Sequence, residues 1–519
     1  MPPGPPAYYI TTPIYYVNDS PHIGHAYTSL ACDVLARFMR LDGYRVHFLT
    51  GTDEHGQKVE KAAITAGRQP QDFVDEVSQR FRALGVAMGY SNDDFIRTTE
   101  PRHIAACQHL WEAIKANGDI YLGKYAGWYS VRDEAFYAED ELRAGPDGHK
   151  LAPSGAPVEW VEEPSYFFRL SAWQERLLRF YDDNPDFIAP DSRRNEVTSF
   201  VRGGLQDLSI SRASFKWGVP VPGDPAHVMY VWLDALTNYI TAVGYPEIES
   251  PLYKSFWPAD LHMVGKDIVR FHAVYWPAFL MSAGVAPPKR VFAHGWWTNE
   301  GQKISKSLGN VIDPIQLVEK YGLDQVRYFL LREVPFGNDG DFSHAAMVRR
   351  MNAELANDYG NLVQRVLSMI NRNCDARVPA PGPFAPEDER LIKLADLLLD
   401  AMREPMHRQQ FHLALERHGE VVSAANRYVD EQAPWALRKT DPARMATVLY
   451  VLAETIRRLA VLSQPFMPGA SARILDQLAV GREARDFIDA FSPEAALTPG
   501  TALPAPSGVF PRFVDEAAA

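Results

Sequence analysis

Two histidines flank a glycine in the stretch SPHIGHAYT, residues 20–28, directly after a proline and before an apolar helical pattern. Histidines three positions apart lie on one face of a helix, here beside the free N–H groups and the positive end of the helix dipole. Three alternatives exist for His22 and His25: metal ligands, packing side chains, or partners of a phosphate. The helix start favours an anion over a metal cation. Gly24 would let a phosphate or a flat ring approach this helix start closely.

A second stretch, GQKISKSLGN at residues 301–310, places Lys303 and Lys306 in a loop rich in glycine and small hydroxyl residues. Such a loop can bring two ammonium groups onto a polyphosphate, and they stabilise the charge that develops on phosphoryl oxygens. For this stretch alone a solvated surface turn is the simpler interpretation, as two packing residues are for the histidine pair alone. The two stretches become informative when the fold brings them together.

The elements around the histidine pair follow a strand–helix–strand pattern. Residues 8–12 are expected to form a short buried strand, residues 13–21 a loop, and the sequence from His22 a helix with one apolar face. The stretch RVHFLTG then predicts a second strand that ends at Gly51. Units of this kind build doubly wound parallel sheets, whose ligands bind at the carboxyl ends of the strands.

The rest of the sequence changes in texture along the chain. Strand and helix patterns alternate, are interrupted by an aromatic, turn-rich stretch, resume, and then give way to purely helical periodicity. The expected fold class is α/β: a Rossmann-like, doubly wound catalytic domain split by an inserted α+β subdomain and followed by an α-helical bundle. The expected boundaries are 1–117 for the first half of the Rossmann domain, 118–225 for the inserted connective subdomain, 226–343 for the second half with the lysine loop, 344–478 for the helical bundle and 479–519 for a C-terminal strap.

Composition narrows the class of protein. The chain has 519 residues, 46% of them hydrophobic, so it can bury more than one core. A formal net charge of −12 argues against a protein that coats nucleic acid nonspecifically, and no DNA partner is expected. The cysteines Cys32, Cys107 and Cys374 are too scattered for a disulfide framework or a four-cysteine zinc site. Without a signal sequence or a run of about 18 apolar residues, a cytoplasmic protein without a membrane partner is expected.

The HIGH and KISKS stretches, in this order across a split nucleotide fold, resemble the two signatures of the class I aminoacyl-tRNA synthetases. The resemblance implies ATP, with Mg²⁺, as the substrate complex. It implies that His22 and His25 contact the ATP phosphates and that Lys303 and Lys306 approach from the other side of the cleft. The residues implied for ATP binding are His22, Gly24, His25, Lys303 and Lys306, with Gly265 and Asp267 as candidates by position.

Four longer stretches are similar to those of the methionyl-tRNA synthetase family: TTPIYYVNDSPHIGH, GTDEHGQK, YVWLDALTNY and GKDIVRFHAVYWPAFL. Aromatic walls suit a flexible, polarizable thioether, and Asp53 is placed to take an ammonium group. We expect Tyr16 and His272 to offer polar contacts to the sulfur, although core packing is the alternative for Trp232 and Tyr239. The implied methionine site consists of Ile14, Tyr16, Asp53, Trp232, Ala235, Tyr239, Ile268, Phe271 and His272.

The same family resemblance assigns three residues of the helical bundle to reading the anticodon. Asn361 and Arg365 lie one turn apart in NDYGNLVQR, and Trp435 follows a proline in DEQAPWALRK. An exposed tryptophan can stack on an unpaired base while Asn and Arg side chains hydrogen-bond base edges. On its own, Trp435 would be interpreted as a core anchor and Asn361 as a surface residue.

The function that the resemblance implies is methionine–tRNA ligation: activation of L-methionine by ATP and transfer to the 3′-terminal adenosine of tRNA(Met). Many members of the family hold zinc with cysteine pairs, but residues 124–164 contain no cysteine, so no metal site and no structural zinc are expected. A monomer is expected as well. The alternatives are a synthetase for isoleucine, leucine or valine, which usually carries an editing insertion, a small nucleotidyltransferase, and a noncatalytic tRNA-binding paralogue.

Overall fold

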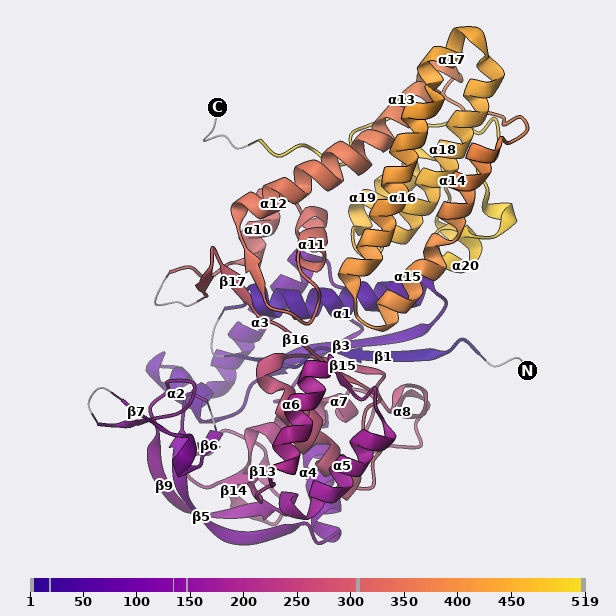
Figure 1. Cartoon of the computed structure of the whole chain (residues 1–519). Helices are drawn as coiled ribbons and strands as arrows, with labels where there is room; N and C mark the ends of the chain where they lie inside the picture. The colour runs from indigo at the N-terminus through magenta and orange to yellow at the C-terminus, as the bar shows by residue number, and fades with distance from the viewer. Residues whose placement is uncertain (1–3, 18–19, 134, 146–147, 305–308, 515–519) are drawn as a thin grey trace.

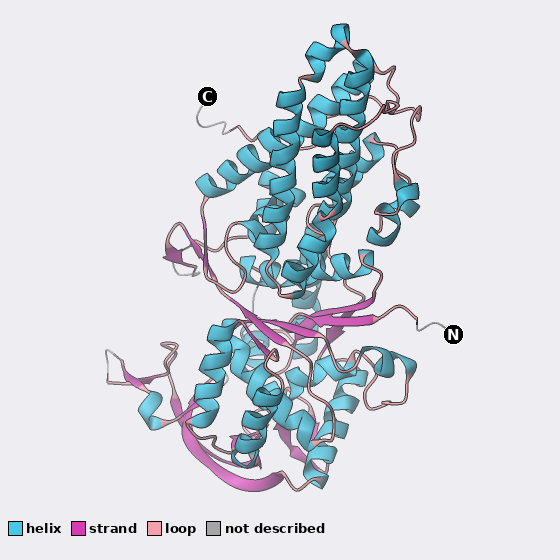
Figure 2. Cartoon of the chain, turned by 45° about the vertical axis from the view of Figure 1, so that its right-hand side comes forward, coloured by secondary structure: helices cyan, strands magenta, loops and turns pink. Residues whose placement is uncertain are grey.

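The computed structural model describes residues 4–17, 20–133, 135–145, 148–304 and 309–514, and shows two bodies joined at a waist (Figure 1). The upper body is almost entirely helical, whereas the lower body combines helices with long curved strands (Figure 2). A sheet crosses the molecule between the two bodies, so each of its faces meets a different set of helices.

This central sheet has seven strands in the order β10–β16–β15–β1–β3–β2, with β4 paired to β3. All its neighbouring strands are parallel, so their carboxyl ends lie at one edge. The predicted fold class, a Rossmann-like parallel sheet followed by a helical domain, is confirmed. The strands are β1 (Ala7–Thr11), β2 (Tyr15–Tyr16), β3 (Arg45–Asp53), β4 (Asp94–Arg97), β10 (Ile188–Ala189), β15 (Leu261–Gly265) and β16 (Val291–His294).

The central sheet is buried on both faces, because neighbouring residues of its strands point into different hydrophobic cores. Successive side chains of a strand point to opposite faces, and here both faces are apolar. Phe48 of β3 belongs to the core that continues into the helical body, and its neighbour Leu49 belongs to the core of the lower body. Met263 and Val264 of β15 divide in the same way. The sheet therefore serves two cores at once.

The first predicted helix begins close to the expected position. It is α1 (Ile23–Leu41), with His22 as its N-cap, and Gly43 follows its end with a φ of 85°. It packs on the upper face of the sheet, whereas α4 and α7 belong to the lower core. The other helices here are α2 (Gln57–Thr65), α3 (Pro70–Met88), α4 (Pro101–Ala116), α7 (Val231–Thr241), α8 (Pro251–Phe256), η3 (Lys266–Ile268), η4 (Phe271–Tyr275), α9 (Trp276–Ser282), α10 (Pro314–Tyr321) and α11 (Leu323–Arg332).

An α+β region lies at the bottom of the molecule and is built on the long antiparallel pair β5 (Ile120–Ser130) and β9 (Glu159–Phe168) (Figure 1). The boundary expected at residue 225 falls inside the last strand of this region. One strand of this region, β10, pairs with β16 at the edge of the central sheet, and this pairing anchors the region to the sheet. Its other elements are β6 (Ala135–Tyr137), η1 (Glu139–Glu141), β7 (Arg143–Ala144), β8 (Lys150–Leu151), η2 (Leu170–Trp173), α5 (Gln174–Asp183), α6 (Asp191–Arg202), β11 (Leu208–Ser209), β12 (Ser211–Arg212), β13 (Pro220–Val221) and β14 (Asp224–Met229).

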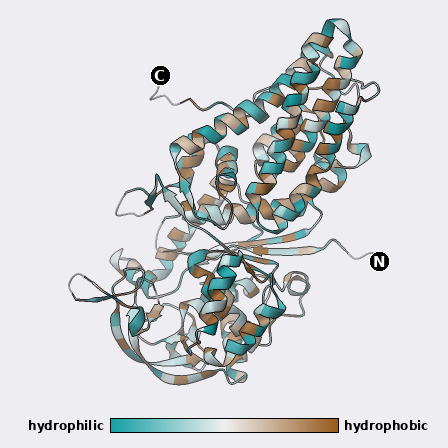
Figure 3. Ribbon diagram, viewed as in Figure 1, coloured by the Kyte–Doolittle hydropathy of each residue, from teal (hydrophilic) through white to brown (hydrophobic). Residues whose placement is uncertain are grey.

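A small sheet of β17 (Trp297–Asn299), β18 (Gln302–Lys303) and β19 (Gly340–Phe342) leads to the helical body. The helices of that body carry apolar residues where they face each other (Figure 3). No helix among the described residues is long and apolar enough to cross a bilayer. The helices of the helical body are α12 (His344–Arg350), η6 (Met351–Gly360), α13 (Asn361–Asn373), α14 (Pro386–Asp396), α15 (Leu398–His407), α16 (Phe411–Gln432), α17 (Pro434–Thr440), α18 (Pro442–Ser463), α19 (Pro468–Gln477), η7 (Arg482–Ala484), α20 (Phe487–Ala490) and η8 (Pro493–Ala495).

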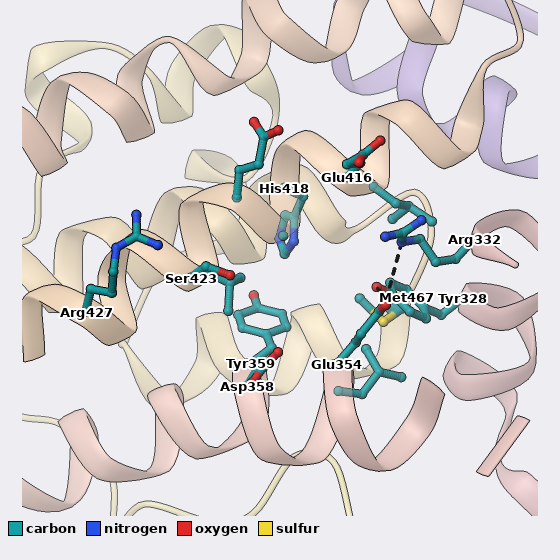
Figure 4. A pocket seen from close by; sticks show the side chains of 15 residues that line it. Tyr328, Arg332, Glu354, Asp358, Tyr359, Glu416, His418, Ser423, Arg427 and Met467 are labelled. Carbon is teal, nitrogen blue, oxygen red and sulfur yellow. Dashed lines mark hydrogen bonds and ion pairs between the residues drawn. The ribbon is translucent and has the colours of Figure 1, made fainter. Parts of the chain in front are cut away.

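A buried ion pair joins α1, on the upper face of the sheet, to the helical body. Arg327 of α11 donates to Asp33 of α1 at 2.7 Å, and neither side chain is exposed. The same guanidinium donates to the carbonyl oxygens of Pro465 and Phe466, which lie between α18 and α19. Beside this contact, α11, η6 and α16 line a cavity of about 350 Å³, shown in Figure 4, where Arg332 lies 3.4 Å from Glu354. Polar contacts therefore reinforce the apolar junction.

Candidate active site

The histidine pair caps the helix that it begins. Nδ1 of His22 accepts a hydrogen bond from the Gly24 N–H, and Nδ1 of His25 accepts one from the His22 N–H, each at 3.1 Å. The ring centroids lie 3.9 Å apart. Because both Nδ1 atoms are acceptors, each neutral ring carries its proton on Nε2. The cap thus leaves one N–H donor on each ring for a partner outside the helix.

Desolvation by the surrounding protein favours the neutral form of these two rings, although the His22 side chain is exposed and that of His25 is half-buried. This desolvation lowers the pKa of His22, against the opposing effect of Asp267, and desolvation together with His22 lowers the pKa of His25 well below its usual value. Neutral donors at the positive end of a helix suit an anionic ligand. Among the described residues, one group is spaced to hold a metal ion, and it includes neither His22 nor His25. It consists of His103, Cys107 and Asp234.

Gly24 is required for a reason closer to hand than a ligand. A Cβ at this position would lie 2.9 Å from Cε1 of His22, so any side chain would displace the capping ring. One residue earlier, the N–H of Ile23 donates to the carbonyl oxygen of Ile312 at 3.2 Å. This hydrogen bond ties the start of α1 to the segment that follows the lysine loop, as a shared cleft requires.

An outer cavity of about 870 Å³ opens between His22 and the lysine loop. Lys303, at the end of β18, lies on its wall and is exposed, whereas Lys306 lies outside the described residues. The side chain of Asn310 donates to the Lys303 carbonyl oxygen at 3.1 Å and closes the base of the loop. The two predicted motifs therefore face one cleft, as far as the described residues extend.

An inner cavity of about 350 Å³ continues from the outer one, with His22, Gly24, His294 and Trp296 on the walls of both. Phe271 is the one predicted methionine residue that does not reach it. The Phe271 ring instead stacks on Trp232, with centroids 3.7 Å apart, and supports that wall from behind. The predicted residues on the inner wall are Ile14, Tyr16, His22, Gly24, His25, Asp53, Trp232, Ala235, Tyr239, Gly265, Asp267, Ile268 and His272.

The carboxyl edge of the sheet supplies the polar end of the inner cavity. Asp53 is the last residue of β3, is 8% exposed, and pairs in register with Tyr16 of β2. This is where parallel strands place ligand-binding side chains. A buried carboxylate at this edge is suited to a substrate ammonium group, because an ion pair is strongest where water is excluded.

The structure revises the expected role of His272. Its Nδ1 lies 2.9 Å from the carbonyl oxygen of Ile268 and so carries the proton, which leaves Nε2 to accept from the Tyr239 hydroxyl at 2.6 Å. Burial lowers the pKa of His272 to about 4, so the ring is neutral. Both ring nitrogens are engaged, and no donor remains for a substrate sulfur. What the geometry supports is that His272 holds the Tyr239 hydroxyl in place.

Sequence reasoning missed two residues on the shared wall. His294 is the last residue of β16 and lies 2.7 Å from the hydroxyl of Thr28 on α1, and the Trp296 indole donates to Asp267 at 3.1 Å. The stretch AHGW contains the end of a strand of the central sheet, so its position at a carboxyl end was the available signal.

The three residues predicted to read an anticodon lie in the helical body. Arg365 of α13 reaches both Trp435, 5.7 Å from its guanidinium to the ring centroid, and Asp430, at 2.9 Å. Trp435 is 52% exposed, and Asn361, one turn before Arg365, is exposed as well. We call these three residues the exposed patch. It lies at α13 and α17, at the far end of the helical body from the sheet (Figure 1).

Two family models cover almost the whole chain. The model described as class I tRNA synthetases (M) matches residues 8–367, and the anticodon binding domain of methionyl tRNA ligase matches residues 378–519. A methionine–tRNA ligase of Mesorhizobium japonicum is 60% identical over 509 residues, which cover 98% of each chain. One of Mycobacterium bovis is 55% identical over 511 residues, again covering 98% of each.

Solved structures agree with these sequence relatives. The Mycobacterium tuberculosis methionyl-tRNA synthetase in complex with methionyl-adenylate has a TM-score of 0.95 and 55% identity, covering 98% of this chain and 100% of that one. The free form of that synthetase has a TM-score of 0.90 and 51% identity, covering 99% of this chain and 100% of that one.

Proposed function

We propose a role for each site residue on the basis that this chain belongs to the class I methionyl-tRNA synthetase family. The chain is a methionine–tRNA ligase, which uses ATP to activate methionine and then transfers it to tRNA. The inner cavity, where eight of the nine expected methionine residues meet the capped histidines, is the observation that carries the assignment.

Methionine is proposed to occupy the inner cavity, with its ammonium group on Asp53. The thioether would lie against Trp232, which Phe271 supports, and near Tyr239, whose hydroxyl His272 holds. Aromatic rings offer favourable contacts to sulfur, and a fixed wall selects for the length of the side chain. Ile14, Tyr16, Ala235 and Ile268 complete the proposed site.

ATP is proposed to lie where the outer and inner cavities meet, as its Mg²⁺ complex. The Nε2–H groups of His22 and His25 would donate to its phosphate oxygens, and Lys303 and Lys306 would neutralise charge from the opposite side. A methionine carboxylate oxygen then attacks the α-phosphorus, the bond from that phosphorus to the bridging oxygen breaks, and pyrophosphate leaves. Because the enzyme forms no covalent bond, positioning and charge stabilisation carry the rate. Gly265 and Asp267 would border the nucleoside.

In the transfer step, the 2′ hydroxyl of the terminal tRNA adenosine attacks the carbonyl carbon of methionyl-adenylate and AMP leaves. We propose that the exposed patch of Asn361, Arg365 and Trp435 reads the anticodon meanwhile. Its exposed indole can stack on an unpaired base, and the neighbouring guanidinium can hydrogen-bond a base edge. The chemistry at the cavities and the reading of the anticodon would thus take place in different parts of the molecule.

We further propose that the chain works as a monomer in the cytoplasm and needs no structural zinc. The thiols of Cys32 and Cys107 are free and buried, which fits a reducing compartment. Residues 124–164, which lie around β5 and β9, have no cysteine to offer as a zinc ligand.

The proposed function is tested by ATP–pyrophosphate exchange without tRNA, using methionine, isoleucine, leucine and valine in turn. The buffer is supplied with magnesium and treated to remove zinc. Exchange with methionine alone is expected. Exchange with a branched aliphatic amino acid would move the chain to a neighbouring specificity, and dependence on added zinc would overturn the zinc-free proposal.

A further inference from the structure

Four side chains outside both cavities form a buried polar cluster beneath the methionine site. They are His55, just after β3, His103 and Cys107 on α4, and Asp234 in the first turn of α7, and we call them the Asp234 network. None is more than 5% exposed. Buried polar groups persist where they are mutually satisfied, so a cluster of this kind fixes the elements that carry it.

Asp234 is the centre of this network. Its Oδ2 accepts from His55 Nδ1 at 2.6 Å, and its Oδ1 accepts from His103 Nε2 at 2.7 Å. The Cys107 thiol lies 3.2 Å from the same His103 nitrogen. Burial acts to raise the pKa of Asp234, but the facing His55 and His103 lower it to about 2. The carboxylate is therefore ionised, and both of its oxygens act as acceptors.

The helix α7 carries this carboxylate on one face and the methionine wall on the other. Trp232, Ala235 and Tyr239, spaced three and four residues apart, line the inner cavity. Asp234 and Thr241, seven residues apart, face α4 instead, where both contact His103. Any shift of α7 relative to Asp234 would therefore move the cavity wall.

The other partner, His55, lies two residues after Asp53, the carboxylate proposed to hold the methionine ammonium group. Its neighbour Glu54 is held separately, by Arg97 through its carboxylate and by the Trp217 indole through its carbonyl oxygen. The His55 ring packs edge-on against Trp217 at 5.5 Å. His55 thus carries a contact from the end of β3 to α7, across 179 residues of sequence.

We propose that Asp234 is a positioning residue for amino-acid recognition: through His55 it sets where Asp53 stands relative to the α7 wall. The inference rests on the proposed function, because it takes Asp53 as the ammonium partner. The ammonium contact and the thioether contact come from elements far apart in sequence. A substrate can satisfy both only if their separation is held constant, and the Asp234 network provides that constraint.

The test uses the full chain with Asp234→Asn and, separately, His55→Phe. An asparagine keeps the shape but replaces one acceptor oxygen with an NH₂ group, and a phenylalanine keeps the ring against Trp217 but removes the donor. The KM for methionine and for ATP is measured by pyrophosphate exchange. Inhibition by 4-(methylthio)butanoate, which is methionine without its amino group, is measured in the same assay.

In both variants the methionine KM should rise about tenfold or more, the cost of losing a hydrogen bond to a charged group. The ATP KM and inhibition by the deaminated analogue should change by less than about threefold, because neither involves Asp53. A parallel loss for methionine and the analogue would mean a general packing defect and overturn the proposal, as would an unchanged methionine KM.

Asp388→Asn is the matched control. Asp388 is as fully buried as Asp234 and also ionised between partners, Arg444 and Tyr428, but it lies in the helical body. This variant should lose stability without changing the methionine KM. If Asp234→Asn does not fold, His55→Phe decides the outcome alone.

Two further measurements separate this inference from its alternatives. If the wild-type protein showed no methionine-dependent pyrophosphate exchange, the proposed function itself would be refuted, whatever the variants do.

The second measurement concerns a metal ion, because His103, Cys107 and Asp234 are close enough to hold one. Elemental analysis of the purified chain should find no metal that Cys107→Ser removes, and a stoichiometric metal lost in that variant would overturn the hydrogen-bond account.

Discussion

The inner cavity and the exposed patch differ in how much of their geometry is already fixed. Around the cavity, the rings of His22, His25 and His272 and the Tyr239 hydroxyl each have hydrogen-bond partners within the protein. In the patch, Trp435 is half-exposed and Arg365 contacts it from the surface. Chemistry requires donors in place before charge develops, whereas an unpaired loop is read by side chains that can adapt to its bases.

Between these two regions lies the junction of α1 with the helical body, which resembles the cavity more than the patch. Asp33 and Arg327 are both fully buried there, and Arg327 also donates to three carbonyl oxygens. If the inner cavity and the exposed patch act separately, changes at the cavity should affect adenylate formation and changes at the patch should affect charging of tRNA. Changes at the junction should affect the stability of the protein.

The largest effect is expected for Arg327→Met. Removing the guanidinium leaves Asp33 ionised and buried, which should cost about 3–5 kcal/mol of unfolding free energy. In the wild type, burial acts to raise the pKa of Asp33 but Arg327 and Arg37 lower it. This stabilisation is therefore present above about pH 4, the usual Asp pKa, and is lost as pH falls below it.

Urea denaturation of wild type and variant at pH 7 and at lower pH tests the junction. The difference in unfolding free energy between the wild type and Arg327→Met should become smaller as the pH falls. Arg365→Met, which removes an exposed guanidinium, is the control and should change stability by about 1 kcal/mol or less. Equal losses for the two variants would contradict the importance assigned to the buried pair.

At the cavity, Lys306→Ala should reduce adenylate formation about 10²–10³-fold while leaving the methionine KM nearly unchanged, because its charge serves the transition state. Lys306 lies outside the described residues, so this prediction rests on the KISKS motif. Pyrophosphate exchange measures the rate. Lys289→Ala, which removes an exposed lysine paired with Asp260, should leave exchange unaffected. Normal exchange by Lys306→Ala would refute the role.

At the patch, Trp435→Ala should weaken charging of tRNA by about 1–3 kcal/mol, the usual contribution of a stacked base. The effect should appear in kcat/KM for tRNA in an aminoacylation assay. Leu397, a similarly exposed apolar residue of the helical body, offers a control as Leu397→Ala. A change in Trp435→Ala no larger than in this control would remove Trp435 from the proposed interface.

The smallest effect is expected for Asp430→Asn. Asp430 is a mostly exposed partner of Arg365, and such pairs contribute about 0–1 kcal/mol to stability. Releasing Arg365 from a competing carboxylate should leave stability unchanged and improve the KM for tRNA slightly. A marked loss of stability would mean that the patch is as rigid as the cavity, and the contrast between the two regions would fail.

Local patterns predicted most of what the structure contains near the motifs. The strand before the histidines, the helix expected from His22 and the strand expected to end at Gly51 all form, because each is determined by short-range periodicity and capping. The last of them continues two residues further, to Asp53. The inner cavity was predicted through family resemblance, since no local rule places Trp232 beside Asp53.

What could not be predicted depends on contacts between distant segments. His272 was expected to meet the substrate, but its partners Ile268 and Tyr239 leave no free ring nitrogen. Asp234 lies in the family-like stretch YVWLDALTNY, but its partners are apparent only when His55 and His103 are seen on either side of it. Sequence patterns fix elements, while the partners of a buried polar group are fixed by tertiary packing.

The central claim is that the cavity activates methionine independently of the exposed patch. The most direct test is pyrophosphate exchange without tRNA by the full chain carrying both Arg365→Ala and Trp435→Ala, with aminoacylation measured on the same preparation. Exchange should match the wild type within about twofold while kcat/KM for tRNA falls about tenfold or more. A comparable loss in both assays would contradict the separation of the two regions.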